Sequence, residues 1–387
     1  MKLTFILPTR NRAELAMAAI RSLLAQEGCD VEILVSDNSS SDDELRRLEE
    51  FVRGADDDRV AYLRPPRELR MAGHWNWIAE QALAREDVTH VALQYDRKVW
   101  KPGALRALID ACERDPEATL TYGCDVSLHS SRGRTALAYP GSGKLYEIRT
   151  RRVVELTARA MIGELEQAFP VFANSIVPRA TLERMRARFG SICESAMPDS
   201  AFAYRFCATE DRYVHFDAAP VVAYAYEKSN GLAYFRGDAS GTYGDWMRLW
   251  GNDAWLDAAP VPNLPLGPNV MFHEYALVQR AAGEERFPRV DFPAYLRVLA
   301  VGLASIENPA LRAELRAVLE RHGWAEERRS LLRRLASRLR APFRRAAPPA
   351  PEFATDAEAV QHLLAPRPFL PKNPNLAALK PVEVAAR

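Results

Sequence analysis

Polar residues directly follow three apolar runs in the first hundred residues of the sequence. PTRNR (Pro8 to Arg12) follows KLTFIL, SDNSSSDD (Ser36 to Asp43) follows VEILV, and DRK (Asp96 to Lys98) follows THVALQY. A carboxylate such as Asp37 can accept hydrogen bonds from a nucleobase or a ribose, and small residues such as Asn38 and Ser39 leave room for a flat base. The basic side chains of the third stretch suit a phosphate.

The elements that must position these residues alternate between strand and helix patterns. The pattern predicts strands over 2–8, 30–37, 59–65 and 89–95, and helices over 12–26, 42–52 and 73–86. This order implies a mainly parallel sheet with helices on both faces. Ligands of such sheets lie beyond the carboxyl ends of the strands, which is where the polar stretches fall.

The composition is that of a globular protein with a sizeable core. Of the 387 residues, 48% are hydrophobic and 27% are charged, and the net charge of +1 gives no reason to expect nucleic acid. The five cysteines have no metal-binding spacing. Neither a signal peptide nor an apolar run near the about 20 residues of a membrane span occurs. We therefore expect a cytoplasmic protein.

The C-terminal part of the sequence changes character twice. Residues 233–325 have mainly helical patterns, and eight arginines with no acid then occur between Arg328 and Arg345. The leucine spacing there predicts a basic amphipathic helix over 326–346. This helix is either attached to an anionic membrane surface or is a solvated or core-docked terminal helix with an arginine-rich outer face. Residues 347–387 are Pro-rich, and we expect a weakly structured tail.

The first two polar stretches together resemble the opening of the family-two inverting glycosyltransferases, which have the GT-A fold. In that family the first strand ends in a P-T-x-N-R type turn, and the second ends in an Asp followed by small polar residues and another Asp. MAGHWNW, which begins at Met71, is a close variant of the family's Met-x-x-Asn-Trp sequence after the third strand. The resemblance covers roughly residues 1–231.

The resemblance implies an α/β fold of the GT-A (Rossmann-like) type, with a mainly parallel sheet flanked by helices and a helical C-terminal region. Residues 1–125 would be the nucleotide-sugar-binding half and 126–232 the half that holds the acceptor and the catalytic base, followed by a helical domain over 233–325. The donor, of UDP, GDP or dTDP type, would be bound by residues of the three loops and of the segment before the third helix. These residues are Pro8, Thr9, Arg10, Asn11, Arg12, Asp37, Asn38, Ser39, Arg70, Asn76, Asp96, Arg97 and Lys98.

The third stretch departs from the family's acidic D-x-D motif, which holds Mg²⁺ or Mn²⁺ against the leaving diphosphate. Aligned on the Pro-Gly-Ala-Leu that follows, the motif falls on Asp96, Arg97 and Lys98, so the last acid is replaced by a base. Three interpretations are open. Lys98 or Arg97 replaces the metal directly, Asp96 alone holds a metal with the diphosphate, or the site is inactive.

An inverting transferase also needs a base that deprotonates the acceptor hydroxyl. In the family this is an Asp or Glu at the start of a helix in the second half, and Asp199 is the position that matches, with Glu194 and Asp211 as lesser candidates. An N-cap role for Asp199 is the structural alternative, and the two roles are compatible. Lys228, Ser229 and Asn230 are a candidate flap over the phosphates or a plain polar turn.

The sequence thus predicts a bacterial glycosyltransferase that moves a sugar from a nucleotide donor to a growing cell-surface glycan, such as an O-antigen or a capsule, with inversion at the anomeric carbon. Its acceptor would be a glycan or lipid-linked glycan, and the protein would lie on the inner face of the cytoplasmic membrane through residues 326–346. The alternative is a catalytically inactive, transferase-like partner module that binds nucleotide or glycan. A nucleotidyltransferase is disfavoured because PTRNRAEL has no glycine.

Overall fold

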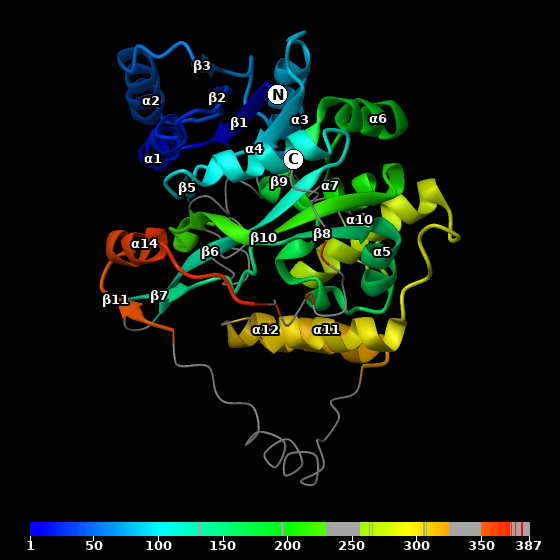
Figure 1. Cartoon of the computed structure of the whole chain (residues 1–387). Coiled ribbons are helices and arrows are strands. Elements are labelled where there is room, and N and C mark those ends of the chain that lie inside the picture. Colours follow the sequence, from blue (N-terminus) through cyan, green and yellow to red (C-terminus); the bar gives the residue numbers. More distant parts are fainter. Residues whose placement is uncertain are drawn as a thin grey trace.

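A mixed sheet runs through the middle of the molecule, with helices on both of its faces (Figure 1). In the part of the chain that the computed structural model describes, the sheet has 11 strands, and β10 pairs with β5, β6 and β8 beside the main path. That path follows the order β11-β7-β6-β9-β4-β1-β2-β3. The described residues are 1–130, 133–194, 197–229, 256–262, 264, 266–304, 306, 308–324, 350–371, 373, 376 and 381.

Strands β1 to β4 form the parallel part of the sheet. The strands are β1 (Leu3–Thr9), β2 (Val31–Asp37), β3 (Val60–Leu63) and β4 (His90–Leu93), joined by helices α1 (Ala13–Leu24), α2 (Asp42–Gly54) and α3 (Met71–Leu83). All seven residues of β1 are buried, because a central parallel strand is covered on both faces and needs a nearly continuous apolar run. The predicted elements of this region are confirmed.

The remaining strands pair mostly antiparallel, although β6 and β10 are parallel to one another. The α/β architecture with flanking helices is therefore confirmed, while parallel pairing is concentrated in the first hundred residues. The physical reason is connectivity, since strands joined without a crossover helix pair antiparallel. The strands are β5 (Lys98–Trp100), β6 (Leu120–Ser130), β7 (Gly133–Leu137), β8 (Leu145–Arg149), β9 (Ser175–Pro178), β10 (Arg212–Ala223) and β11 (Glu352–Phe353).

Two large cores cover the two faces of the sheet. One is built against α1, α2 and α4 (Ala104–Arg114), and the other against α3, α5 (Thr150–Ala158), α6 (Arg179–Phe189) and α7 (Pro198–Thr209). The expected division at residue 125 falls inside β6, so the two halves share one sheet. The described part of the predicted helical region contains α10 (Gly267–Ala282), α11 (Phe292–Ala304) and α12 (Pro309–Arg321), and α10 contacts α7.

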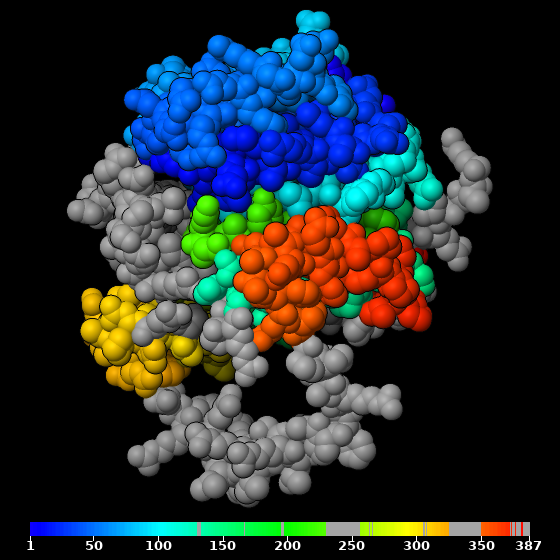
Figure 2. All heavy atoms as spheres, turned by 90° about the vertical axis from the view of Figure 1, so that its left-hand side faces the viewer, coloured from blue at the N-terminus to red at the C-terminus, as the bar shows by residue number. Residues whose placement is uncertain are grey.

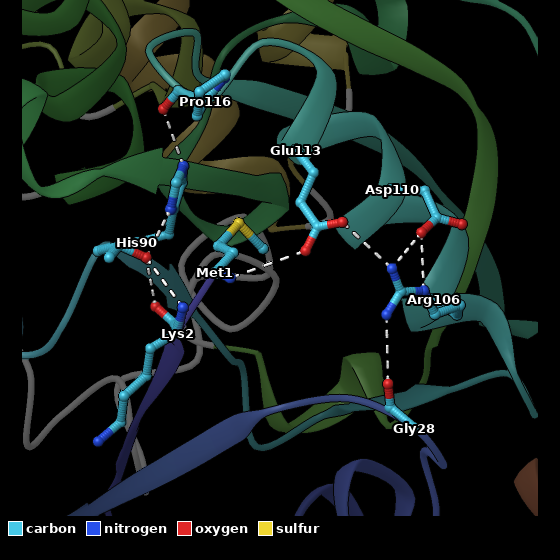
Figure 3. Close-up of polar contacts among 9 residues, drawn as sticks. Met1, Lys2, Gly28, His90, Arg106, Asp110, Glu113 and Pro116 are labelled. Atoms are coloured by element: carbon cyan, nitrogen blue, oxygen red, sulfur yellow. Dashed lines mark hydrogen bonds and ion pairs between the residues drawn. The ribbon is translucent and has the colours of Figure 1, made fainter. Parts of the chain in front are cut away.

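Polar contacts with α4 close the edge of the sheet at which β1 and β4 begin (Figure 3). The amino group of Met1 lies 3.8 Å from a carboxylate oxygen of Glu113. Arg106, two helical turns earlier, donates to the carbonyl oxygen of Gly28 at 3.4 Å, just before β2. The opposite edge, at the carboxyl ends of the parallel strands, is where the predicted site residues gather.

Residues 350–371 pack on the second half of the sheet through β7, and Figure 2 shows them in orange and red on the surface of the molecule. The prediction of a weakly structured tail is therefore wrong for residues 350–371, which contain β11 and α14 (Asp356–Leu364). β11 pairs with β7, and α14 begins with a capping box between Thr355 and Glu358. Leu363 is fully buried against the sheet. A T-x-x-E sequence before an apolar stripe was the signal for this helix.

Two of the predictions fall on residues outside the described part of the chain. These are the basic amphipathic helix over 326–346 and the flap residue Asn230. Among the described residues, no helix combines the length and the apolar character required to cross a membrane.

Candidate functional site

A pocket of about 500 Å³ opens beyond the carboxyl end of β2. Its floor is Asp37, whose side chain is fully buried. The backbone N–H of Ser39 donates to Asp37 Oδ1 at 2.9 Å, and the hydroxyl of Tyr62 donates to Oδ2 at 3.3 Å. Burial raises the pKa of Asp37, while these donors act in the opposite direction. The pocket is lined by Asp37, Asn38, Ser39, Ser40, Arg64, Pro65, Pro66, Arg67 and Glu68.

Asn11 joins the loop after β1 to the loop after β2. Its Oδ1 accepts from the backbone N–H groups of Ser40 and Ser41 at 3.0 and 3.2 Å, and its own N–H donates to the hydroxyl of Ser39 at 2.7 Å. The residue has φ +52°, a left-handed conformation that Asn tolerates better than most side chains. The expected proximity of the two loops is thus present, and Asn11 is the residue that holds them together.

Arg10 and Asn38 connect these loops to the segment before α3. The guanidinium of Arg10 donates to the carbonyl of Asn38 at 3.2 Å and forms an ion pair with Glu68. The Asn38 side chain makes two hydrogen bonds with the backbone of Leu69, at 2.8 and 3.0 Å. Arg70, the next residue, is the N-cap position of α3. These contacts fix one wall of the pocket.

The third stretch brings Asp96 to the end of β1. Thr9 donates its hydroxyl proton to Asp96 Oδ2 at 3.0 Å, and a guanidinium nitrogen of Arg12 lies 3.6 Å from Oδ1. Arg12 also donates to the carbonyl oxygen of Lys228, in the short helix η4 (Tyr226–Lys228). Arg12 therefore links Asp96 to the segment predicted as a flap. Pro8, by contrast, is buried within β1.

Lys98 lies on the other side of β4 from Asp96. Asp96 and Arg97 form a turn in which the Lys98 N–H donates to the carbonyl of Tyr95 at 3.1 Å, so the side chains at 96 and 98 diverge. The Lys98 ammonium is buried and donates to the Ala173 carbonyl at 2.8 Å. In the structure Asp96 contacts Thr9 and Arg12, whereas Lys98 contacts Ala173. The sequence predicts both residues at the diphosphate.

Asp199 stands at the first turn of α7 and reaches the third loop. The hydroxyl of Tyr95 donates to Asp199 Oδ2, and the Ala173 N–H donates to Oδ1 at 3.3 Å. Burial raises the pKa of Asp199, and the nearby Lys98 ammonium partly opposes that rise. The expected juxtaposition of Asp199 with the loop that carries Asp96 is present.

Arg97 points between two aromatic rings. Its guanidinium carbon lies 5.0 Å from the ring centroid of Tyr226 in η4 and 5.9 Å from that of Tyr95. One guanidinium N–H donates to the carbonyl of Tyr224 at 3.4 Å. A second cation therefore faces the η4 segment, which also carries Lys228, whose side chain is exposed, and Ser229.

The lesser base candidates lie in other ion pairs. Glu194 pairs with Arg205, and Asp211, before β10, lies 3.1 Å from Arg286. Neither carboxylate has a hydrogen bond to the loop that carries Asp96 among the contacts of the described residues. Asp199 is thus the candidate that the fold brings to the third loop.

Asn76 and His74 of α3 make contacts that the sequence did not indicate. The Asn76 side chain bonds the backbone of Ile192 and Cys193 at 2.7 to 3.2 Å, which ties α3 to the loop before α7. His74 is buried 2.6 Å from the hydroxyl of Ser36, and burial lowers its pKa to about 3. Both residues hold loops of the site in place.

The residues present do not fit a divalent metal site. Mg²⁺ and Mn²⁺ prefer several oxygen ligands, yet Asp96 is the one acid of the third stretch, and Thr9 and Arg12 already contact its two oxygens. In the described ranges, no group of three or more His, Cys, Asp or Glu side chains has the geometry of a metal site. Positive charge beside Asp96 comes from the guanidinium of Arg12 instead.

Tyr95, Ala173 and Asn174 belong to this site, and the sequence did not single them out. Tyr95 could have been noticed because it lies between a buried strand and Asp96. An aromatic residue at such a position is more often a packing residue, so this signal is weak. Ala173 acts through its backbone, which no residue pattern reveals.

The chain is similar to known proteins, and the family match lies in its N-terminal part. The model of the family described as "Glycosyl transferase family 2" matches residues 4–156, which include β1 to β8. A GalNAc(5)-diNAcBac-PP-undecaprenol beta-1,3-glucosyltransferase of Campylobacter jejuni is 44% identical over 61 residues, which are 16% of this chain and 19% of that protein. The match therefore spans less than a fifth of the relative's length.

Solved structures of S. aureus TarS (residues 1–349) are similar over most of the chain. The complex with UDP-GlcNAc has a TM-score of 0.48 at 15% identity and covers 83% of this chain and 91% of that one. The complex with UDP has the same TM-score and identity and covers 84% and 92%. The residues that match the glycosyl transferase family 2 model, 4–156, include Asp37 and Asp96.

Proposed function

We propose that the protein is an inverting glycosyltransferase that moves a sugar from a nucleotide-sugar donor to a glycan acceptor. The observation that carries the proposal is the hydrogen bond of Asp199 to Tyr95, the residue before Asp96, in a fold whose Asp37 pocket lies beyond the carboxyl end of β2. We assign the nucleoside site to the Asp37 pocket, the cations for the diphosphate to Arg12 and Arg97, and the carboxylate base to Asp199. The family 2 match over residues 4–156 supports it.

In the proposed reaction, Asp37 binds the nucleoside in its pocket and Arg12 and Arg97 face the diphosphate. The acceptor hydroxyl attacks the anomeric carbon of the sugar while Asp199 takes the hydroxyl proton. The bond between the anomeric carbon and the diphosphate oxygen breaks on the opposite face, and the electron pair leaves with the nucleoside diphosphate. The guanidinium groups stabilise the charge that develops on this leaving group. No step is assigned to a metal.

The acceptor is proposed to be a growing cell-surface glycan carried on a lipid. The Campylobacter relative is named for an undecaprenol diphosphate-linked substrate, and the 61 matched residues support a related acceptor class. We further propose that the protein works in the cytoplasm on the inner face of the membrane. The arginine-rich sequence of residues 326–346 supports this placement, because basic segments are attracted to anionic lipids.

The test is calorimetric titration of UDP, GDP and dTDP into the purified protein, first with EDTA and then with Mn²⁺. Binding of one nucleotide in EDTA, followed by transfer of its sugar to a lipid-linked glycan, is the expected result. Binding without any transfer, from a panel of UDP-, GDP- and dTDP-sugars, would favour the inactive partner module. No binding in either condition would reject both functions.

A further inference from the structure

Lys98 is a buried cation whose contacts lie away from the diphosphate side of the site. Its side chain comes from β5, between β10 and the turn at Asp96, and is 6% exposed. The ammonium donates to the Ala173 carbonyl at 2.8 Å and to Oδ1 of Asn174. It also lies 4.7 Å from the ring centroid of Tyr95. These partners satisfy it within the protein, as a buried charge requires.

Two of the three residues that contact Lys98 also contact Asp199. Ala173, in the short helix η3 (Phe172–Asn174), accepts from Lys98 through its carbonyl and donates to Asp199 through its N–H. Tyr95 lies under the Lys98 ammonium and donates its hydroxyl proton to Asp199. Lys98 and Asp199 thus share two contact partners, the backbone of Ala173 and the side chain of Tyr95.

We propose that Lys98 is a positioning residue for Asp199, which it acts on by fixing Ala173, Asn174 and Tyr95, and that it does not contact the donor diphosphate. The inference rests on the proposed function, in which Asp199 is the base. In this proposal Lys98, the basic residue that replaces the last acid of the D-x-D motif, serves the acceptor side of the reaction. The diphosphate then depends on Arg12 and Arg97.

The charges around Asp199 are consistent with this role. The groups that face it are the Tyr95 phenol, the Lys98 ammonium, the Tyr226 phenol and the Cys193 thiol, each from a different element or loop. Lys98 is the cation among these four. The hydrogen bonds from Tyr95 and the Ala173 N–H also oppose the effect of burial on the pKa of Asp199, so removing the Lys98 charge removes one of three opposing groups. This would move the acid limb of the kcat profile to higher pH.

The variant Lys98→Met removes the ammonium and keeps the length of the side chain. We expect the affinity for UDP, measured by calorimetry, to stay within about twofold of the wild type, while kcat falls at least about tenfold. The matched control is Lys2→Met, whose ammonium pairs with Asp87 at the far end of the sheet. A loss of UDP affinity of about tenfold or more, or an unchanged kcat, would overturn the proposal.

Asn174→Leu tests the contact between Lys98 and Asn174 by changing the acceptor. It provides the test of the proposal if Lys98→Met does not fold. It removes one acceptor of the ammonium and leaves the charge in place. We expect kcat to fall with unchanged UDP affinity and unchanged donor KM. Wild-type kcat in a folded Asn174→Leu protein would count against the proposal.

A double-mutant cycle on unfolding separates this inference from the proposed function, because it needs no activity. Urea unfolding is measured for Lys98→Met, Asp199→Asn and the double variant. We expect the unfolding constant of the double variant to differ at least about fivefold from the product of the single effects. Additivity would overturn the coupling of Lys98 to Asp199. Coupling in a protein that transfers no sugar would leave the positioning contact standing and reject the proposed function.

Discussion

A guanidinium nitrogen of Arg12 lies 3.6 Å from a carboxylate oxygen of Asp96, across the carboxyl ends of β1 and β4. Asp96 aligns with the first acid of the D-x-D motif, so the carboxylate that would bind a metal in that motif is in contact with an arginine side chain here. The same arginine donates to the carbonyl of Lys228, which connects this ion pair to the η4 segment. Arg12 is therefore the first residue to test.

Arg12→Met should weaken nucleoside diphosphate binding by about ten- to a hundredfold, because a charged hydrogen-bond donor contributes about 1.5–3 kcal/mol. Calorimetry with UDP measures the effect. Arg53→Met is the control, since Arg53 is exposed on α2 and pairs with Glu49. Equal affinities of the two variants would show that Arg12 serves only to hold Asp96.

Asp199→Asn should lower kcat by about a hundred- to ten-thousandfold, the usual contribution of a general base. UDP affinity should not change, because the proposed role of Asp199 is to act on the acceptor hydroxyl. Glu194→Gln and Asp211→Asn serve as matched controls, since both carboxylates sit in other ion pairs. A larger loss in either control would transfer the role of base to that residue.

If Asp199 is the proposed base, its carboxylate should set the acid limb of the rate profile. Burial raises the pKa of Asp199 above its ordinary value of 3.8, and the active form of a base is the ionised one. Activity should therefore fall as the pH drops through that raised value. A raised carboxyl pKa also means that stability is lost as pH rises through the folded value, so Asp199→Asn should keep or increase Tm at pH 7. A clear drop in Tm would instead reveal a structural role.

His74 should make the folded protein sensitive to acid. Its pKa is about 3 in the fold and 6.5 ordinarily, so neutral His74 contributes stability that is present above pH 6.5 and is lost as the pH falls toward 3. Urea unfolding at pH 7 and pH 4.5 should show a smaller pH dependence for His74→Gln than for the wild type. His322→Gln, at an exposed position after α12, should leave that dependence unchanged. An unchanged pH dependence in His74→Gln would contradict the prediction.

The C-terminal segment should contribute to the stability of the sheet. Arg367 forms an ion pair with Asp125, a fully buried carboxylate that also pairs with Lys101 at 2.6 Å. Arg367→Met should lower the free energy of unfolding by about 1–3 kcal/mol, because it removes one partner of a buried charge. Gln361→Ala, at an exposed position of α14, is the control for urea unfolding. Equal stability of both variants would show that Lys101 alone suffices.

The sequence alone determined the order of strands and helices in the first hundred residues and the placement of Asp37 at a pocket. These depend on local patterns, since a continuous apolar run predicts a buried strand and a polar stretch after it predicts the carboxyl edge. It also identified Asp199, which the fold brings to Tyr95 across 104 residues of chain. That prediction came from a family resemblance, because no local pattern encodes a contact at such a separation.

Only the tertiary structure decided what Asp96 and Lys98 contact. The two residues are close in sequence, but the turn at 96–97 directs one toward β1 and the other toward η3, next to β9, and β1 and β9 flank β4 on opposite sides. The docking of residues 350–371 was equally out of reach, because its partners Asp125 and β7 lie more than two hundred residues earlier. Residue types fix which interactions are chemically possible, and packing between distant elements selects among them.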